Sequence, residues 1–231
     1  MSARFALYFA PQRDSLLARF GDAWLGRDAE SGAPLVPPAA TGFDPARLAA
    51  LTEGPRHYGF HGTLKPPFEL ADGSDAAELR AALATFAARQ PIFTIPQLAL
   101  RQLGDFLAFV PAQEVPALAR LADACVSEFD AFRAPPKAAE LAKRQAGGLT
   151  ARQSALLARW GYPYVMEEFR FHLTLTGPVP EAPERNRLAA ALAPLAAPVL
   201  AEAVPVRELC LFHQAERAAP FRLTDRFAFA T

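Results

Sequence analysis

The sequence contains two similar stretches, each with a histidine followed two residues later by a threonine. The first copy contains His61 and Thr63, and the second contains His172 and Thr174. The copies align without a gap, with a phenylalanine before each histidine and a leucine after each threonine. The whole chain has four histidines, so the repeated context of two of them argues against coincidence. The pair indicates a site with two imidazoles and two hydroxyls.

Both copies have the alternation of a β-strand, in which successive side chains point to opposite faces. Each histidine therefore shares a face with its threonine, and the apolar side chains beside them occupy the other face. The same alternation adds Lys65 to the first polar face and Arg170 to the second. If two halves of the fold face each other, the polar faces meet across a cleft.

Such a cleft suits the hydrolysis of a phosphodiester. Histidine titrates near neutral pH, so one imidazole can activate water as a base while the other protonates the leaving oxygen as an acid. Thr63 and Thr174 can donate hydrogen bonds to the phosphate, and Lys65 and Arg170 can stabilise the developing negative charge. These groups provide for proton transfer and for anchoring, so neither a metal nor another cofactor is expected. The motif leaves open which histidine is the acid, and the two cations can equally be solvated surface charges.

The remaining histidines and the cysteines indicate no second site. His57 and His61 have the spacing of zinc ligands on a helix, but the aromatic pattern around them indicates a strand, on which they are well separated. His213 falls in a predicted late strand and is interpreted as structural. Cys125 and Cys210 lie in unrelated contexts and are predicted to be buried small hydrophobic residues.

The composition is that of a globular protein with a small anionic ligand. Of its 231 residues, 52% are hydrophobic and 21% charged, and the formal net charge is zero. A protein that binds long RNA or DNA usually has a basic stripe. We therefore expect a small phosphorylated metabolite as partner, and neither a long nucleic acid nor a membrane. The first apolar run is too short for a signal peptide and no run is long enough to cross a bilayer, so a cytoplasmic location is expected, while the oligomeric state stays open.

The order of the predicted elements indicates a duplicated α+β fold. Each half contains a strand with the His-x-Thr motif, then a helix, then two strands, which favours two antiparallel sheets lining a central cleft with helices outside. The clearest helix starts are Asp44 before Pro45 and the capping box of Asp75 and Glu78. We predict a single bilobal domain with lobe one at about 1–130, a helical insertion at about 131–161 and lobe two at about 162–231.

The predicted elements have the following approximate bounds. Besides the motif strands, which begin near residue 58 and span 164–176, strands are expected at 4–10, 91–102, 106–111, 204–213 and 221–230. Helices are expected at 14–25, 44–52, 75–88, 115–129, 138–146 and 183–195, with a further helix opening at Thr150.

The insertion breaks the duplication and carries candidate substrate contacts. Its first helix contains Arg144, and the segment is either a solvated helical face or a lid that grips a second phosphate. Tyr162 and Tyr164, which follow it, can stack on a base or sugar. Tyr8 on the first strand can extend its hydroxyl toward the cleft. Each tyrosine also fits an ordinary packing role.

The paired motif resembles the two-histidine (2H) phosphoesterase superfamily, which includes cyclic nucleotide phosphodiesterases and 2′,5′ RNA ligase-like proteins. The wider context resembles the DUF1045 family, bacterial proteins associated with phosphonate metabolism. The segments that carry this resemblance are Tyr8–Pro11, Trp24–Asp28, Tyr58–His61 and Trp160–Val165.

The resemblance implies a bilobal α+β fold with a central cleft and no metal. It implies that His61 and His172 are catalytic and that Thr63 and Thr174 bind phosphate. It also implies a substrate from carbon–phosphorus lyase degradation, such as 5-phosphoribosyl 1,2-cyclic phosphate. Two alternatives remain: an enzyme acting on RNA ends with a 2′,3′-cyclic phosphate or a 2′,5′ linkage, and a non-catalytic module that binds phosphoesters.

Overall fold

The computed structural model describes residues 3–40 and 42–230 of the chain. Its centre is a seven-stranded sheet in the order β4-β5-β6-β2-β1-β8-β9, and all of its pairs are antiparallel. A separate antiparallel pair joins β3 and β7. The predicted α+β class is confirmed. The strands are β1 (Arg4–Phe9), β2 (Gly62–Phe68), β3 (Phe93–Ile95), β4 (Leu98–Leu103), β5 (Phe106–Pro111), β6 (Leu173–Thr174), β7 (Val204–Val206), β8 (Glu208–Gln214) and β9 (Arg222–Ala228).

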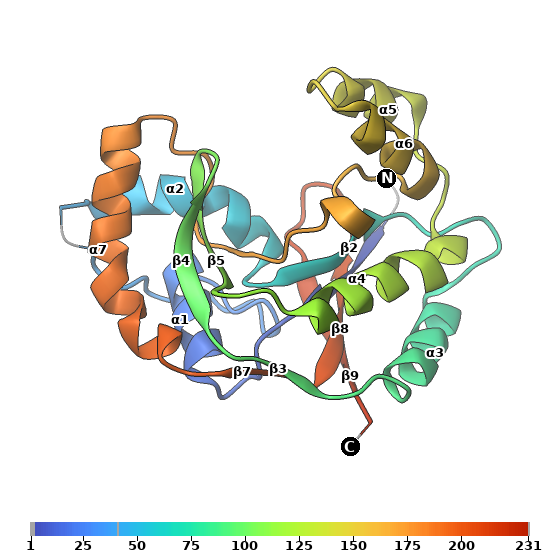
Figure 1. The fold of residues 1–231 in the computed structure, drawn as a ribbon, viewed down its shortest axis with the longest axis horizontal. Coiled ribbons are helices and arrows are strands. Elements are labelled where there is room, and N and C mark those ends of the chain that lie inside the picture. The colour runs from blue at the N-terminus through green and yellow to red at the C-terminus, as the bar shows by residue number, and fades with distance from the viewer. Residues whose placement is uncertain (1–2, 41, 231) are drawn as a thin grey trace.

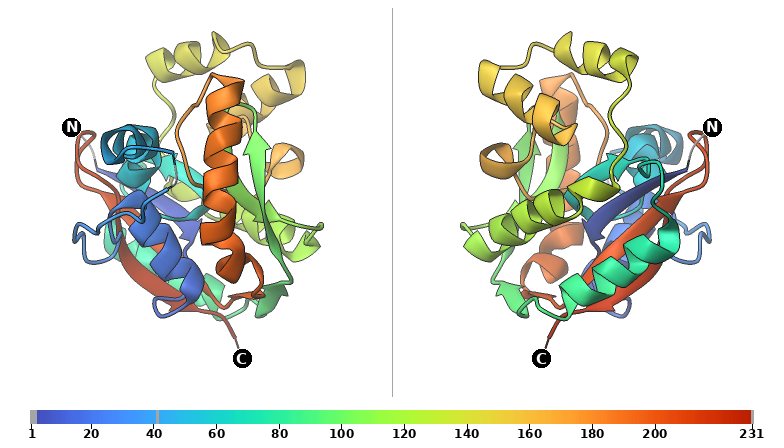
Figure 2. Two further views of the ribbon diagram at one scale, coloured as in Figure 1. Left: turned by 90° about the vertical axis from the view of Figure 1, so that its left-hand side faces the viewer. Right: turned by 90° about the vertical axis from the view of Figure 1, so that its right-hand side faces the viewer.

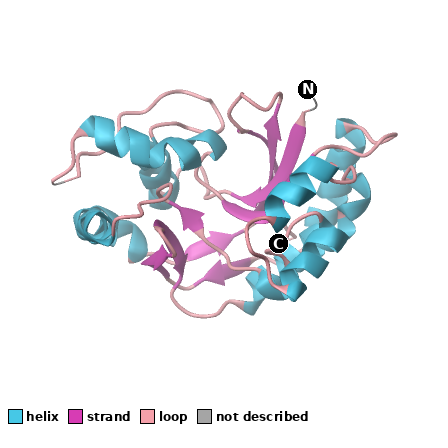
Figure 3. Cartoon of the chain, turned by 90° about the horizontal axis from the view of Figure 1, so that it is seen from above, coloured by secondary structure: helices cyan, strands magenta, loops and turns pink. Residues whose placement is uncertain are grey.

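Helices cover the two ends of the sheet (Figures 1 and 3). At one end α3 packs on β8 and β9, while α4 packs on β2 in the middle of the sheet. At the other end α7 packs on β4 and β5 and also contacts α1 (Figure 2), which in turn contacts α2. The helices are α1 (Leu16–Leu25), α2 (Pro45–Tyr58), α3 (Ala76–Ala87), α4 (Pro116–Glu128), α5 (Ala138–Gln145), α6 (Ala151–Trp160) and α7 (Ala182–Leu200), with short 3₁₀ turns at Asp130–Phe132 and Met166–Glu168.

The two halves of the sequence exchange strands in this sheet. β1 and β2 from the first half pair with each other, and β1 also pairs with β8 from the second half. In the other part of the sheet β6, from the second half, pairs with β5 from the first half. The pairing therefore runs across the boundary predicted near residues 130–162, and the two parts join edge to edge through β2 and β6. The division into two consecutive lobes stays a prediction.

Local capping signals account for the helix starts. The Asp75 side chain accepts hydrogen bonds from the first turn of α3, while Glu78 reaches back to the Asp75 backbone. Thr150 and Gln153 make the same reciprocal pair at α6. Asp44 caps α2, as predicted. These signals act within one turn of helix, so they can be read without knowing the tertiary structure.

The motif segments are less regular than the sequence predicts. Helix α2 continues past the expected end at residue 52 as far as Tyr58, because Arg56 ties its last turn to Thr52 and to the Leu25 carbonyl. Gly59, at φ 82°, then ends the helix, so β2 begins only at Gly62. The second motif forms a two-residue strand, β6, in place of the long strand expected from residue 164.

The insertion is held by its own small hydrophobic cluster. Leu156 of α6 and Val165 pack together with Val126 of α4, and Trp160 and Tyr162 pack against them. Figure 1 shows α5 and α6 standing apart from the main body of helices. In the described part of the chain, no helix combines the length and the apolarity that a membrane crossing needs.

Candidate active site

The two His-x-Thr motifs lie side by side in the middle of the sheet. β2 and β6 run antiparallel, and Gly62 pairs with Leu173. Each of these is the middle residue of its motif, so the register sets each histidine opposite the threonine of the other strand. The polar groups therefore meet on neighbouring strands of one sheet, around a local pseudo-twofold axis.

The glycine in the first motif makes this close approach possible. A Cβ atom at Gly62 would lie 2.5 Å from the ring of Phe171, the buried residue that precedes His172. The second motif has Leu173 at the equivalent position, and Leu173 is fully buried. The difference between the two motifs therefore reflects how the strands pack.

Both imidazoles are held in the same way. His61 Nδ1 lies 2.8 Å from the Gly59 carbonyl, and His172 Nδ1 lies 2.7 Å from the Arg170 carbonyl. A carbonyl can only accept, so each Nδ1 donates a hydrogen, and in the neutral ring Nε2 carries the lone pair. His61 Nε2 lies 3.2 Å from Thr63 Oγ1, a distance at which the hydroxyl donates to the ring. Each Nε2 is thus available to take a proton.

Burial shifts the pKa of both histidines downward. Loss of solvent and, to a smaller extent, the proximity of His172 lower the pKa of His61 to about 4, against the opposing effect of its hydrogen bond to the Gly59 carbonyl. Burial also lowers the pKa of His172, against the opposing effect of its hydrogen bond to the Arg170 carbonyl. Tyr8 covers His61, with ring centroids 3.8 Å apart and the rings 20° from parallel. At neutral pH both rings are therefore neutral when no ligand is bound.

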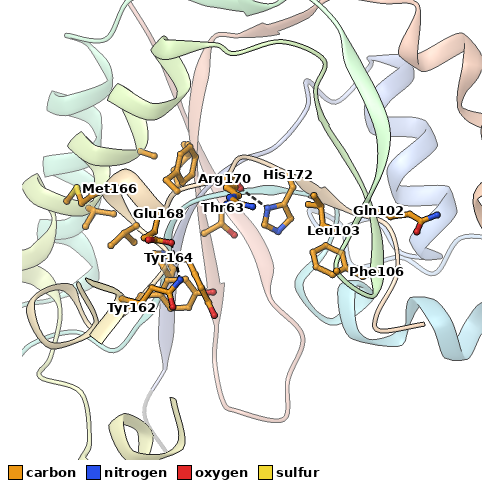
Figure 4. Close-up of a pocket in the computed structure, with 18 residues that line it drawn as sticks. Thr63, Gln102, Leu103, Phe106, Tyr162, Tyr164, Met166, Glu168, Arg170 and His172 are labelled. Carbon is orange, nitrogen blue, oxygen red and sulfur yellow. Dashed lines mark hydrogen bonds between the residues drawn. The ribbon is translucent and has the colours of Figure 1, made fainter. Parts of the chain in front are cut away.

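Two adjoining cavities meet at the motifs, and both are lined by Thr63, Pro66, Phe106 and Tyr162. The His172 cavity, shown in Figure 4, has a volume of about 610 Å³ and also contains Tyr164 and Arg170. The His61 cavity has a volume of about 470 Å³ and contains His61 and Thr174. The structure thus brings both histidines and both threonines to two adjoining cavities that share four lining residues.

Lys65 does not reach this space, and the prediction that it shares the polar face of the first motif is wrong. Tyr8 pairs with Thr63, but the next pair is Leu7 with Lys65, so Leu64 is an extra residue in β2. This β-bulge reverses the alternation and turns Lys65 toward the core. The lysine is 2% exposed, and its Nζ donates to the Val126 carbonyl at 3.0 Å and lies 3.8 Å from Asp130 Oδ1.

Arg170 lies at the rim of the site. Its side chain is exposed and lines the His172 cavity. Within the described residues its guanidinium has no hydrogen-bond or ion-pair partner, while its carbonyl fixes the ring of His172. The predicted position near the second histidine therefore agrees with the structure, and its phosphate-binding role stays a prediction.

The four predicted contact residues all line the two cavities. Tyr8 and Arg144 line the His61 cavity, Tyr164 the His172 cavity, and Tyr162 both. The Arg144 guanidinium lies over the Tyr162 ring, 4.8 Å from its centroid. Tyr164 meets Tyr162 edge to face and is 49% exposed.

The sequence reasoning missed Arg4 and Tyr58, which also line the His61 cavity. Arg4 lies on β1, four residues before Tyr8 and on the same face of that strand. Strand alternation applied to the first predicted strand would have found it. Tyr58 ends α2, and its place depends on the unexpected length of that helix.

No metal site emerges among residues 3–40 and 42–230. In that part of the chain there is no group of three or more His, Cys, Asp or Glu side chains with the geometry to hold a metal ion. Cys125 and Cys210 are buried and unpaired with each other, in agreement with the prediction. The ring of His213 lies 4.9 Å from that of Phe5, tilted by 31°, and lines neither cavity.

Comparison with known proteins gives a family and a set of relatives. The model of the family described as "Protein of unknown function (DUF1045)" matches residues 63–222. A ribose 1,5-bisphosphate phosphokinase PhnN from Janthinobacterium sp. (strain Marseille) is 45% identical over 173 residues, which are 75% of this chain and 38% of that protein. One from Laribacter hongkongensis (strain HLHK9) is 38% identical over 221 residues, 95% of this chain and 50% of that protein. The chain thus spans half or less of these curated relatives.

Two of the solved structures that are similar to this chain have low sequence identity to it. E. coli LigT in complex with 3′-AMP has a TM-score of 0.47 at 17% identity, with all of both chains covered. A protein described as a phosphoesterase has a TM-score of 0.46 at 16% identity, with 99% of each chain covered.

Proposed function

The chain belongs to the DUF1045 family, and we propose that it is a metal-independent cyclic phosphodiesterase acting on a small cyclic sugar or nucleotide phosphate. The observation that carries this proposal is the pairing of the two motifs across β2 and β6. It brings two histidines with Nδ1–H bonded to backbone, and two threonine hydroxyls, to two adjoining cavities.

The proposed reaction needs only these four side chains and water. One neutral imidazole takes a proton from water at Nε2 while the water oxygen attacks phosphorus. The bond between phosphorus and one ring oxygen breaks, and the second imidazole, protonated at Nε2, gives its proton to that oxygen. The threonine hydroxyls donate to the non-bridging oxygens, where charge accumulates. The product is a phosphate monoester with a free hydroxyl, and solvent exchange restores the two histidines.

The relatives support a ribose phosphate as substrate. Their name refers to ribose 1,5-bisphosphate. Hydrolysis of 5-phosphoribosyl 1,2-cyclic phosphate at the bond between phosphorus and O2 leaves phosphates on C1 and C5, which is ribose 1,5-bisphosphate. We propose this cyclic phosphate as the substrate. The reaction would then supply the compound that the names of these relatives mention.

The test is hydrolysis of that cyclic phosphate by the wild type and by two variants, His61→Ala and His172→Ala. Each variant should lose roughly 10²- to 10⁴-fold in kcat, the usual contribution of a positioned acid or base. EDTA should leave the wild-type rate unchanged. His213→Ala is the control, because His213 lines neither cavity. Full activity in either of the first two variants would exclude the two-histidine mechanism.

The His172 cavity supports a second candidate, an enzyme acting on a nucleotide or an RNA end with a 2′,3′-cyclic phosphate. Tyr164 and Phe106 line a cavity of about 610 Å³, and aromatic side chains of this kind stack on unpaired bases. A higher kcat/KM for a short cyclic-phosphate RNA than for the cyclic ribose phosphate would favour this substrate. Tight binding without hydrolysis of either compound would favour a non-catalytic module.

A further inference from the structure

We propose that Arg4 and Arg144 form a second anion site, in the His61 cavity, that binds a phosphate monoester on the substrate. This inference rests on the proposed function and deepens it, because it assigns residues that select substrates with two phosphates. The cyclic phosphate would lie at the two His-x-Thr motifs, and the second phosphate would lie between a strand of the sheet and a helix of the insertion.

Arg4 is held in place with most of its donors free. It stands on β1, and its Nε donates to Gln214 Oε1 at 2.7 Å. Its guanidinium lies 5.2 Å from the centroid of the Phe221 ring. Among the residues that the structure describes, its two terminal nitrogens have no hydrogen-bond partner. A planar guanidinium fixed at Nε presents the remaining donors in the geometry that phosphate oxygens accept.

Arg144 approaches the same cavity from α5. One terminal nitrogen lies 3.2 Å from Glu140 Oε1, and the guanidinium lies over the Tyr162 ring. Its Nε is buried and has no partner within the described chain. A buried donor without a partner costs free energy, so a bound anion that accepted from it would relieve this cost.

Tyrosines surround the two arginines and supply neutral donors. Tyr8, Tyr58 and Tyr162 all line the His61 cavity. Burial raises the pKa of Tyr8 and of Tyr162, so their hydroxyls stay protonated at neutral pH and can donate to phosphate oxygens. Burial also lowers the pKa of Arg4, as does the nearby Arg217. The cavity therefore offers two guanidinium groups and three tyrosine hydroxyls to an anion.

The first experiment compares two substrates that differ in one phosphate: adenosine 2′,3′-cyclic phosphate with and without a 5′-phosphate. The wild type should prefer the 5′-phosphorylated compound in kcat/KM. Arg4→Gln and Arg144→Gln should each reduce this preference by roughly 10- to 100-fold, the scale of a hydrogen bond to a charged group. Activity on the compound without the 5′-phosphate should stay within about threefold of wild type.

Arg152→Gln is the matched control. It removes the same charge from the same insertion, but Arg152 pairs with Glu167 and lines neither cavity. An unchanged preference in both Arg4→Gln and Arg144→Gln would overturn the proposal. So would an equal loss on both substrates, because that would indicate a general structural effect.

The second experiment does not depend on turnover. Calorimetry should show that ribose 5-phosphate binds to the wild type and to His172→Ala, and that Arg4→Gln and Arg144→Gln weaken this binding by at least about tenfold. If both arginine variants weaken ribose 5-phosphate binding but no cyclic phosphate is hydrolysed, the anion site is supported and the proposed enzyme activity is refuted. If ribose 5-phosphate binds equally well to all variants, the anion site is refuted whatever the enzyme does.

Discussion

His61 and His172 have matching hydrogen bonds but different surroundings. Each donates from Nδ1 to the carbonyl two residues before it. His61 also lies against Tyr8 and near the two arginines of the His61 cavity, whereas the ring of His172 faces Phe106 at 5.7 Å. The copies therefore share the machinery for proton transfer and differ in what lies beside it.

The lowered pKa values predict an acidic optimum for kcat/KM. The free protein must hold one histidine neutral and the other protonated, a state that is most populated between the two pKa values. The pKa of His61 is about 4 and that of His172 lies below its usual 6.5. The profile should therefore be bell-shaped with its maximum below pH 6.5, and should fall roughly tenfold per pH unit on the alkaline side. Initial rates at low substrate from pH 4 to pH 9 test this.

His213→Ala should give a profile that superimposes on the wild type, because His213 lies outside both cavities. If kcat/KM reached its maximum above pH 7, the bell-shaped pH profile could not be assigned to two desolvated histidines.

For single residues, the sequence predicts that the motif histidines and threonines lie together, but it does not predict every residue that surrounds them. Repetition and strand alternation are enough to predict that the four motif side chains lie close together, and they line two adjoining cavities. The same rule failed at Lys65, because a β-bulge is a property of how β1 and β2 pair. No local pattern of residues around Leu64 shows it.

Among the elements, β2 has two functions separated by its bulge. Before the bulge it presents Thr63 to the site, and after it Lys65 lies under the end of α4. The cation is placed at the C-terminal end of the helix, where the helix dipole favours positive charge. Regular alternation would place residue 65 on the face that lines the site. Because of the bulge, Lys65 instead anchors the end of α4.

Lys65→Met tests whether Lys65 stabilises the fold and Thr63 serves the site. The variant should keep kcat/KM within about threefold of wild type, whereas Thr63→Val should lose roughly 10- to 100-fold. Burial lowers the pKa of Lys65 to about 8 in the folded protein, from 10.5. Between these values the unfolded chain binds more protons, so this group makes the folded state more stable as pH rises. The free energy of unfolding of wild type relative to Lys65→Met should therefore increase by about 2 kcal/mol between pH 8 and pH 10.

Urea unfolding of both proteins at the two pH values measures this difference, in which the titration of other groups cancels. A loss of activity in Lys65→Met as large as that in Thr63→Val would indicate that Lys65 contributes to the candidate active site.

Helix caps and helix ends differ in how far the sequence predicts them. The starts of α2, α3 and α6 were predicted because each cap is a contact within four residues. The end of α2 was not, because Arg56 reaches the Leu25 carbonyl of another helix. That extra turn sets the position of Tyr58 in the His61 cavity, so part of the candidate site depends on a contact that local sequence does not show.

Considered as a whole, the molecule is a duplication whose halves have exchanged strands. The order of elements predicted the duplication and the α+β class, but not the exchange, since pairing partners distant in sequence leave no local signal. Zero net charge predicted a small ligand. It did not reveal that Arg4 and Arg144, distant in sequence, line one cavity.

The insertion is the part of the molecule whose order should depend most on a ligand. Among the side chains that the structure describes, α5 contributes none to the buried clusters, whereas α6 is anchored through Leu156 and Leu157. Segments with few buried apolar contacts open at low free energy. In hydrogen exchange followed by mass spectrometry, we therefore expect peptides covering 138–145 to exchange earlier than those covering α3 in the free protein.

Ribose 5-phosphate should slow this exchange if Arg144 binds the second phosphate. At a concentration near 100 times its Kd the ligand stabilises a bound segment by up to about 2.7 kcal/mol, or roughly 100-fold in exchange. Helix α3, which packs on the far edge of the sheet, should be unaffected, and Arg144→Gln should lose the protection of α5 only. Protection confined to the motif segments 59–65 and 170–176 would show that the ligand binds without engaging the insertion. That result would contradict the assignment of Arg144 to the second phosphate.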